Sequence, residues 1–221
     1  MFDADWAIAG GAKIDEALVG LRAKFSFPEK VGDLALTPRF SPLVGVPDES
    51  WWELPQLVAL LDGAKQTVRV EVLTYKTIGR DKQFWSTLED ALRRAAARGV
   101  KVRMLVADWS KRAGTIEGLQ SLEPLANVEV KLVTIPPFSG GHVPFGRVAH
   151  AKFAVVDGEH TWIGTSNWER DYFEQSRNAC FFVDGASLAV RLEQFFDELW
   201  STPYAYAVDP GAKYEVPKIG D

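Results

Sequence analysis

The chain has 221 residues, of which 47% are hydrophobic and 25% are charged, as is usual for one globular domain. Its net charge of −5 argues against the dense basic face that binds duplex nucleic acid non-specifically. No apolar run approaches the roughly 18 residues of a membrane-spanning helix, residues 1–10 lack the pattern of a signal peptide, and the single cysteine, Cys180, excludes an internal disulfide. We therefore expect a soluble chain, whose compartment the sequence does not indicate.

The first 49 residues show no sustained hydrophobic period. Ile14–Phe25 is predicted to form a short helix, and the prolines and glycine that follow predict a connecting segment over residues 26–49. Ser50-Trp51-Trp52-Glu53 has the pattern of a helix-capping box. Apolar residues at helical spacing follow it, so we expect a helix to begin there.

From residue 50 onward, strand-like and helix-like patterns alternate. The alternation predicts an α/β layered domain, with a central mixed β-sheet flanked by helices. We assign residues 1–49 to an N-terminal segment, 50–207 to this domain and 208–221 to a C-terminal tail. The predicted strands are Thr67–Tyr75, Val100–Ala107, Val128–Ile135, Ala151–Val156, Thr161–Gly164 and Ala179–Val183. Further helices are predicted over Phe84–Ala95, Ile116–Leu125 and Leu188–Leu199.

The first residues of the chain resemble the end of its last predicted helix. Phe2-Asp3-Ala4-Asp5-Trp6 and Phe196-Asp197-Glu198-Leu199-Trp200 share the pattern F-D-x-x-W. If the first copy is the counterpart of the second, residues 1–6 are the tail of a preceding repeat. A match over five residues also arises by chance, so both interpretations stay open.

The most informative pattern is H-x-K-x4-D-x6-G-T-x-N, which begins at His150 and ends at Asn167. His150 and Lys152 stand two residues apart at the start of a predicted strand, so they should share one face of it. A buried ammonium without a partner is costly, which favours a bound anion at this position. Asn167 follows the next strand and should lie beside the same place. An imidazole, an ammonium and an amide together suit a phosphodiester substrate.

This pattern resembles the signature of the phospholipase D superfamily. The resemblance extends from about Phe40 to Ala207. This stretch is similar to the C-terminal half of phospholipase D3/D4-type 5′ exonucleases and of poxvirus-type phospholipases. It implies a phospholipase D-like fold in which two such motifs meet at one site. One histidine attacks phosphorus to form a phosphohistidine, and the other protonates the leaving oxygen and then activates water.

The resemblance also implies roles for individual residues. In two-motif relatives the second histidine is usually the acid and base, so His150 takes that role here. Lys152 and Asn167 are expected to hold the non-bridging oxygens. Asp157 belongs to the motif, but we expect it to fix local hydrogen bonds without touching substrate. No metal or other cofactor is implied. The predicted substrate-binding residues are Tyr75, Thr165, Ser166 and Trp168.

The sequence departs from many single-motif relatives at one position. Those relatives carry a glutamate about eleven residues after the motif asparagine, where it supports the histidine. The residue here is Asn178. We therefore expect another group to orient His150.

One motif supplies one histidine, whereas the implied chemistry needs two. The expected partner is a second motif-bearing half, either an N-terminal domain of a longer polypeptide or the mate in a homodimer; we favour the former. Single-stranded nucleic acid and phospholipid are both open as substrates, because aromatic residues near the site could stack on bases or line a lipid pocket. Transfer to an alcohol, as in a phosphatidyltransferase, and a non-catalytic phosphate-binding half-domain are the alternatives. The candidate aromatic residues are Trp51, Trp52, Tyr75, Trp109, Phe138, Phe145, Trp168, Tyr172 and Phe173.

Overall fold

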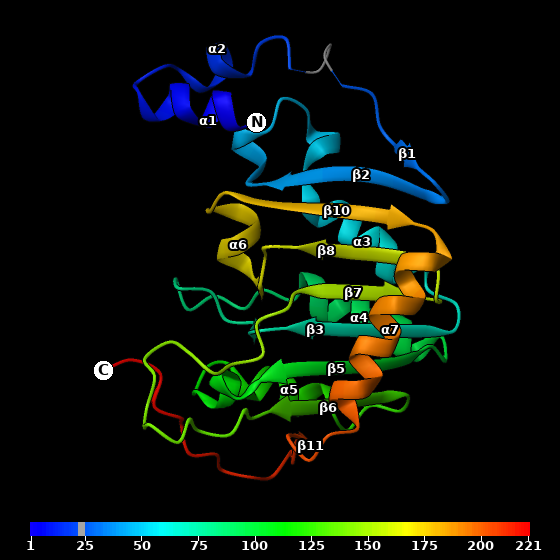
Figure 1. The fold of residues 1–221 in the computed structure, drawn as a ribbon, viewed down its shortest axis with the longest axis vertical. Helices are drawn as coiled ribbons and strands as arrows, with labels where there is room; N and C mark the ends of the chain where they lie inside the picture. Colours follow the sequence, from blue (N-terminus) through cyan, green and yellow to red (C-terminus); the bar gives the residue numbers. More distant parts are fainter. Residues whose placement is uncertain (22–24) are drawn as a thin grey trace.

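A computed structural model gives the structure of residues 1–21 and 25–221, which form a nine-stranded sheet in the order β1-β2-β10-β8-β7-β3-β5-β6-β11 (Figure 1). β3, β5 and β6 are parallel neighbours, and the other neighbours are antiparallel. The predicted mixed sheet is therefore confirmed. The strands are β1 Glu29–Val31, β2 Leu34–Ser41, β3 Thr67–Val72, β5 Lys101–Ala107, β6 Val128–Val133, β7 Phe153–Val156, β8 His160–Gly164, β10 Asn178–Asp184 and β11 Ala205–Ala207.

Helices cover both faces of this sheet. α3, α4 and α5 lie on one face, and α7 crosses the other face (Figure 1). A second, two-stranded sheet joins β4 to β9 at one edge of the molecule. The bounds of these elements are α1 Phe2–Ala9, α2 Ile14–Leu18, α3 Glu53–Gly63, β4 Tyr75–Lys76, α4 Thr87–Ala97, α5 Ile116–Leu122, β9 Trp168–Glu169, α6 Arg170–Glu174 and α7 Ala186–Trp200.

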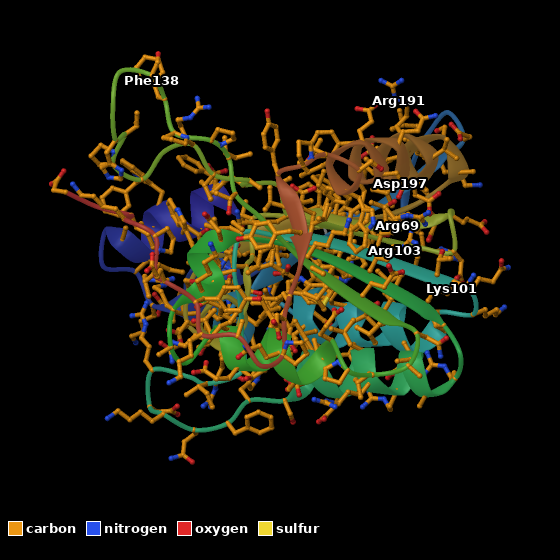
Figure 2. All side chains as sticks on the ribbon, turned by 90° about the horizontal axis from the view of Figure 1, so that it is seen from below. Arg69, Lys101, Arg103, Phe138, Arg191 and Asp197 are labelled. Atoms are coloured by element: carbon orange, nitrogen blue, oxygen red, sulfur yellow. The ribbon has the colours of Figure 1, made fainter. Side chains whose placement is uncertain are left out.

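Each face of the sheet has its own apolar core. Residues of α3 and α4 pack on alternate residues of β3 and β5 in the larger core. The smaller core joins Phe153 of β7 to Phe196 of α7. Ion pairs also hold α7: Nη1 of Arg69 on β3 lies 2.6 Å from Glu193 Oε1, and its Nε lies 3.3 Å from Asp197 Oδ1 (Figure 2). The sheet is thus fixed from both sides.

The predicted strands and helices between residues 67 and 200 are all present, with bounds that differ by a few residues. The turn at Asp157-Gly158 is confirmed, since both residues have positive φ, at 54° and 66°, as a tight hairpin turn requires. The helix predicted over Ile14–Phe25 is present at Ile14–Leu18. Residues 22–24 of that prediction lie outside the described residues.

Two expectations for the N-terminal part are wrong. Residues 26–49 are not only a connecting segment, because β1 and β2 join the sheet and β2 pairs with β10 along Leu36–Ser41. The sheet therefore begins before residue 50. The capping box is also absent: α3 begins at Glu53 after Trp52, which makes no side-chain cap hydrogen bond. Ser50 instead donates its backbone N–H to Asp48 Oδ1 at 2.7 Å.

Both copies of the F-D-x-x-W pattern lie on helices. Phe2 and Trp6 stack on α1 with their ring centres 6.1 Å apart, and Phe196 and Trp200 stack on α7 at 5.5 Å. The α7 pair is buried, whereas the α1 pair is exposed. The preceding-repeat interpretation stays a prediction. Among the helices of the described residues, none has both the length and the apolar character needed to cross a membrane.

Candidate functional site

The strand directions bring the separated parts of the motif to one edge of the sheet. β7 runs antiparallel to β3, and β8 runs antiparallel to β7. The start of β7 and the end of β8 therefore lie at the same edge as the carboxyl ends of β3 and β5. His150 and Lys152 precede β7 at this edge, and Asn167 follows β8. The histidine and lysine lie in the connecting loop rather than in the strand predicted to begin at Ala151, because β7 begins at Phe153.

Lys152 is a fixed cation beside His150. Its Nζ donates to the carbonyl oxygen of His150 at 2.9 Å and lies 3.4 Å from His150 Nε2, and the residue is only 7% exposed. Burial lowers the pKa of Lys152, and the Glu71 carboxylate partly restores it. Burial and the charge of Lys152 together lower the pKa of His150. The imidazole is therefore mainly neutral at pH 7.

Asn167 is held rigidly at the same edge. It is 2% exposed, its Nδ2 donates to the hydroxyl of Tyr172 at 3.0 Å, and its Oδ1 accepts from the backbone N–H of Thr74 at 3.4 Å. The amide is thus fixed by partners on β9–α6 and at the end of β3. A fixed amide needs no reorganisation when an anion arrives, which suits it to stabilise charge.

Gly164 connects the two halves of the motif. Its backbone N–H donates to the carbonyl oxygen of Lys152 at 3.1 Å. A Cβ at this position would lie 2.5 Å from Cβ of Cys180 and 2.9 Å from the carbonyl oxygen of Ala179. The close approach of β8 and β10 therefore requires glycine here.

Glu71 is a site residue that the sequence analysis missed. It lies on β3 beside the start of β7, with Phe153 as its cross-strand neighbour. It is 2% exposed, and its Oε2 has no hydrogen-bond partner among the described residues. Burial raises its pKa to about 7, although the charge of Lys152 lowers it. One signal pointed to it: it is an acidic residue inside an otherwise buried strand.

Ser166, a predicted substrate-binding residue, has a structural role. It is fully buried and donates its hydroxyl to Glu53 Oε2 at 2.9 Å. Glu53 also accepts from the hydroxyl of Ser41 at 2.9 Å and from the indole N–H of Trp162 at 3.0 Å. Burial raises the pKa of Glu53, and these donors lower it in part. Ser166 thus anchors the loop that carries Asn167, and its contact with substrate stays a prediction.

Tyr75 and Trp168, two further predicted substrate-binding residues, are buried, and their contact with substrate stays a prediction. Their side chains are 1% and 0% exposed and belong to the larger apolar core. The Tyr75 hydroxyl donates to Glu89 Oε2 at 3.2 Å, and the ring of Trp168 packs on Trp162 with centres 6.1 Å apart. Their backbones pair as β4 and β9. They pack beneath the edge of the sheet that carries the motif.

Thr165 is exposed, and it forms a hydrogen bond with Asn178, the residue at the position where many single-motif relatives carry glutamate. Its Oγ1 donates to Asn178 Oδ1 at 2.9 Å, while Asn178 Nδ2 donates to the carbonyl oxygen of Tyr172 at 2.8 Å. Within residues 1–21 and 25–221, the hydrogen bonds of Asn178 do not reach His150. The group that contacts His150 is Lys152.

Asp157 lies at the opposite edge of the sheet, past the end of β7. Its carboxylate accepts from the backbone N–H groups of Lys65, Gln66 and Thr67 at 2.8, 2.8 and 2.9 Å. Burial raises the pKa of Asp157, whereas the three backbone donors and the charge of His160 lower it. The lowering effects are together the larger, so the net shift of the pKa is downward. This motif residue fixes the start of β3 and does not join His150, as its expected structural role requires.

The chain matches a known protein family over most of its length. The family model described as cardiolipin synthase, PLD-like domain, matches residues 57–200. Phospholipase D Z of Dictyostelium discoideum is 33% identical over 174 residues, which cover 76% of this chain and 41% of that protein. The 5'-3' exonuclease PLD4 of Mus musculus is 32% identical over 177 residues, which cover 71% of this chain and 35% of that protein. The chain therefore spans less than half the length of these relatives.

Two solved structures share the fold. NucT from Helicobacter pylori superposes with a TM-score of 0.63 at 17% identity, covering 79% of this chain and 99% of that one. Nuc from Salmonella typhimurium, a phospholipase D family member, gives a TM-score of 0.59 at 15% identity over 79% and 97% of the two chains. At these identities the likeness concerns the fold alone, and both neighbours are matched over almost their full length.

Proposed function

Because the chain belongs to the phospholipase D superfamily through its PLD-like domain, we propose that it supplies one half of a metal-independent phosphodiesterase centre. The observation that carries the proposal is the pairing of His150 with the buried ammonium of Lys152, whose Nζ lies 3.4 Å from His150 Nε2. A buried ammonium beside an imidazole favours a bound anion at this position. The rigid amide of Asn167 at the same edge adds a neutral donor.

The proposed reaction has two steps and uses two histidines. In the first, the imidazole nitrogen of one histidine forms a bond to phosphorus, the bond to the leaving oxygen breaks, and the second histidine gives that oxygen a proton. In the second, the now neutral second histidine takes a proton from water, the water oxygen bonds to phosphorus, and the phosphorus–nitrogen bond breaks. His150 is the acid and base in this scheme; in a symmetric dimer, either copy can take either role.

The neighbours of His150 tune this chemistry. Burial and the charge of Lys152 keep the imidazole mainly neutral. A bound phosphodiester carries a negative charge that offsets the charge of Lys152, so the pKa of His150 rises when substrate binds. His150 then takes up the proton that the leaving oxygen needs. Glu71, whose pKa is about 7, offsets part of the charge of Lys152.

The second histidine comes from outside this motif. We propose that another motif-bearing half supplies it, either in the same polypeptide or in a second copy of this chain. Of the other two histidines, His160 lies at the opposite edge of the sheet, where its Nδ1 is 2.6 Å from Asp184 Oδ1. His142 lies in the loop before the motif and contacts the carbonyl oxygen of Gly220 at 2.8 Å. Both are already engaged.

The proposed substrate is single-stranded nucleic acid. The relative named 5'-3' exonuclease PLD4 favours it, although phospholipase D Z keeps a lipid diester open. The name of the matching family model also keeps transfer to an alcohol open. Hydrolysis and transfer share the phosphohistidine and differ only in the acceptor. Added primary alcohol therefore separates them, because only a transferase converts it into a new diester.

A cleavage assay tests the proposed function. The assembled protein should cleave a single-stranded oligonucleotide with a free 5′-hydroxyl in the presence of excess EDTA. Replacement of His150 by alanine should abolish this cleavage, because no other imidazole contacts Lys152 among the described residues. Cleavage that EDTA removes, or that His150→Ala keeps, would count against the proposal. Release of phosphatidic acid from phospholipid, without oligonucleotide cleavage, would move the assignment to lipid.

A further inference from the structure

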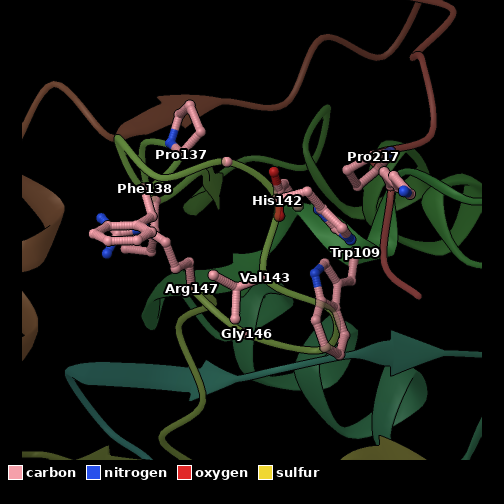
Figure 3. Close-up of a pocket in the computed structure, with 12 residues that line it drawn as sticks. Trp109, Pro137, Phe138, His142, Val143, Gly146, Arg147 and Pro217 are labelled. Atoms are coloured by element: carbon pink, nitrogen blue, oxygen red, sulfur yellow. The ribbon is translucent and has the colours of Figure 1, made fainter. Parts of the chain in front are cut away.

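A cavity of about 220 Å³ lies at the site edge, beside the start of the motif (Figure 3). Its walls come from three segments: residues 108–109 after β5, the loop 135–147 before His150, and residues 217–218 near the C-terminus. β5 and β3 are parallel neighbours, so Trp109 follows a strand that ends at the same edge as the motif. Arg147 of the cavity wall precedes His150 by three residues, which limits their Cα separation to about 11 Å.

Hydrogen bonds join the loop to the C-terminal segment and fix the loop internally. The backbone N–H of Phe145 donates to the carbonyl oxygen of Ile219 at 2.7 Å. His142 Nε2 contacts the carbonyl oxygen of Gly220 at 2.8 Å. Arg147 Nε donates to the carbonyl oxygen of Pro136 at 2.7 Å. The loop is therefore shaped before a ligand arrives, which lowers the entropic cost of binding.

Aromatic rings and cations both face this cavity. Trp109 and Phe138 line it, and the Trp109 ring contacts the edge of Phe145 with centres 6.5 Å apart and planes at 78°. Phe138 is 53% exposed, and it stands at the far end of the molecule from Arg69 and Asp197 (Figure 2). Such rings offer flat faces on which a base can stack.

The charges around the cavity decide between the candidate ligands. Arg147 and Lys218 bring positive charge, and His142 adds a titratable nitrogen. The one carboxyl, Asp108, is buried, and this burial raises its pKa although Thr134 and Lys111 lower it in part. The excess of positive charge repels a quaternary ammonium headgroup. It suits a nucleic acid, in which a neutral base is attached to an anionic phosphate backbone. The volume also lies below the roughly 300–1,000 Å³ of pockets that enclose drug-sized ligands.

We propose that this cavity binds one base of a single-stranded nucleic acid next to the phosphodiester at His150, with Trp109 and Phe138 as the stacking residues. The inference rests on the proposed function, because it places the strand across the His150 site. It goes beyond that function by naming the residues that distinguish a nucleic acid from other diesters.

Equilibrium binding tests this inference. Affinity is measured by fluorescence anisotropy for a short single-stranded oligothymidylate and for a phosphodiester oligomer of the same length that lacks bases. All proteins carry His150→Ala, so that the strands stay intact. Trp109→Ala should weaken oligothymidylate binding by about 5- to 150-fold, as loss of one stacked base does, and should leave binding of the base-free oligomer unchanged.

Two further variants make the result decisive. Phe138→Ala, at an exposed position, should weaken the same ligand selectively even if Trp109→Ala lowers stability, which a thermal melt reports. Trp6→Ala is the matched control, since Trp6 is an exposed tryptophan on α1, and it should change neither affinity. Equal affinity of the parent for the two oligomers would overturn the inference. So would equal losses on both in the variants, or Trp109-dependent binding to phosphatidylcholine vesicles alone.

A separate readout distinguishes this inference from the proposed function. With His150 restored in the parent protein, hydrolysis of bis(p-nitrophenyl) phosphate reports the proposed function without a nucleic-acid base, and Trp6→Ala should hydrolyse it at the parental rate. If the parent itself does not hydrolyse this diester while base-selective binding persists, the proposed function fails and the base site stands. If hydrolysis proceeds without base-selective binding, the base site alone fails.

Discussion

At the scale of single residues, the site depends on charges held at fixed distances. Lys152 touches His150 twice, through its carbonyl oxygen and its Nε2. Glu71 is the carboxyl that interacts with Lys152 from inside the sheet. The site therefore places a carboxyl group with a pKa of about 7, that of Glu71, next to the ammonium of Lys152. An arriving phosphodiester enters a site whose positive charge is already in place.

Replacing Lys152 with methionine should raise the pKa of His150. Burial and the charge of Lys152 are the two causes that lower this pKa, and the substitution removes the second. The value should move toward the ordinary histidine pKa of about 6.5, as measured by NMR titration of the imidazole protons. Lys213→Met, in the exposed C-terminal segment, is the control. An unchanged or lower His150 pKa in Lys152→Met would refute the electrostatic coupling.

Asp157→Asn should destabilise the fold without changing the pKa of His150. An amide can keep one acceptor oxygen but turns an N–H toward the backbone donors that Asp157 now binds, at a cost of about 1–3 kcal/mol. Asparagine also tolerates the left-handed φ of 54°. Urea unfolding at neutral pH measures the loss.

The pH dependence of that loss has a defined sign. Because the folded-state pKa of Asp157 is lowered, its contribution is complete above the unfolded value of about 3.9. It disappears as the pH falls through the folded-state pKa. The stability difference between wild type and Asp157→Asn should therefore be constant near neutrality and shrink below pH about 4. A difference that grows on acidification would contradict this account.

At the scale of elements, a buried carboxyl joins segments that are distant in sequence. Glu53 at the start of α3 accepts hydrogen bonds from Ser41 of β2, Trp162 of β8 and Ser166 of the motif loop. It fixes the loop that carries Asn167 relative to the sheet. The sequence pattern could not indicate this role, because its partners lie 12, 109 and 113 residues away.

Glu53→Leu should destabilise the protein by roughly 3 kcal/mol or more, since three buried donors lose their acceptor. Glu49→Leu is the matched control: Glu49 is exposed four residues earlier, and its replacement should leave the free energy of unfolding nearly unchanged. Denaturant titration of the three proteins measures both effects. Equal stability of the two variants would show that the Glu53 network contributes nothing.

The elements that sequence could predict are those with a local signal. Strands β3 and β6 carry apolar residues that alternate with charged ones, β5 is largely apolar, and α4 and α7 carry apolar residues at helical spacing. β2 was missed because prolines at 38 and 42 suggested turns, whereas its position in the sheet is set by pairing with β10.

The same distinction applies to the site. His150, Lys152 and Asn167 were found through their fixed spacing. Glu71 was missed because burial and the charge of Lys152, not spacing, define its role. The burial of Tyr75 and Trp168 was not predicted, because nothing in their local pattern indicates the contacts with Glu89 of α4 and with Trp162. The spacing of residues in the sequence thus predicts which chemical groups come together, whereas only the structure shows which side chains are buried.

At the scale of the whole molecule, the proposed centre needs two motif-bearing halves. If a second copy supplies the other half, light scattering should show a species of twice the chain mass, and diesterase activity should rise with its fraction. If the other half lies in the same longer polypeptide, the isolated chain should stay monomeric and gain activity only when that half is added. A monomer that turns over diester at a rate independent of concentration would contradict the two-histidine centre.

The most direct test uses a diester with neither base nor lipid chain. The rate of bis(p-nitrophenyl) phosphate hydrolysis in excess EDTA is compared for the assembled wild type, His150→Ala and His160→Ala, whose histidine pairs with Asp184 at the opposite edge. The two-histidine account predicts that His150→Ala loses at least about 100-fold and that His160→Ala keeps the wild-type rate. Equal rates in the wild type and His150→Ala, or a rate that EDTA abolishes, would contradict it.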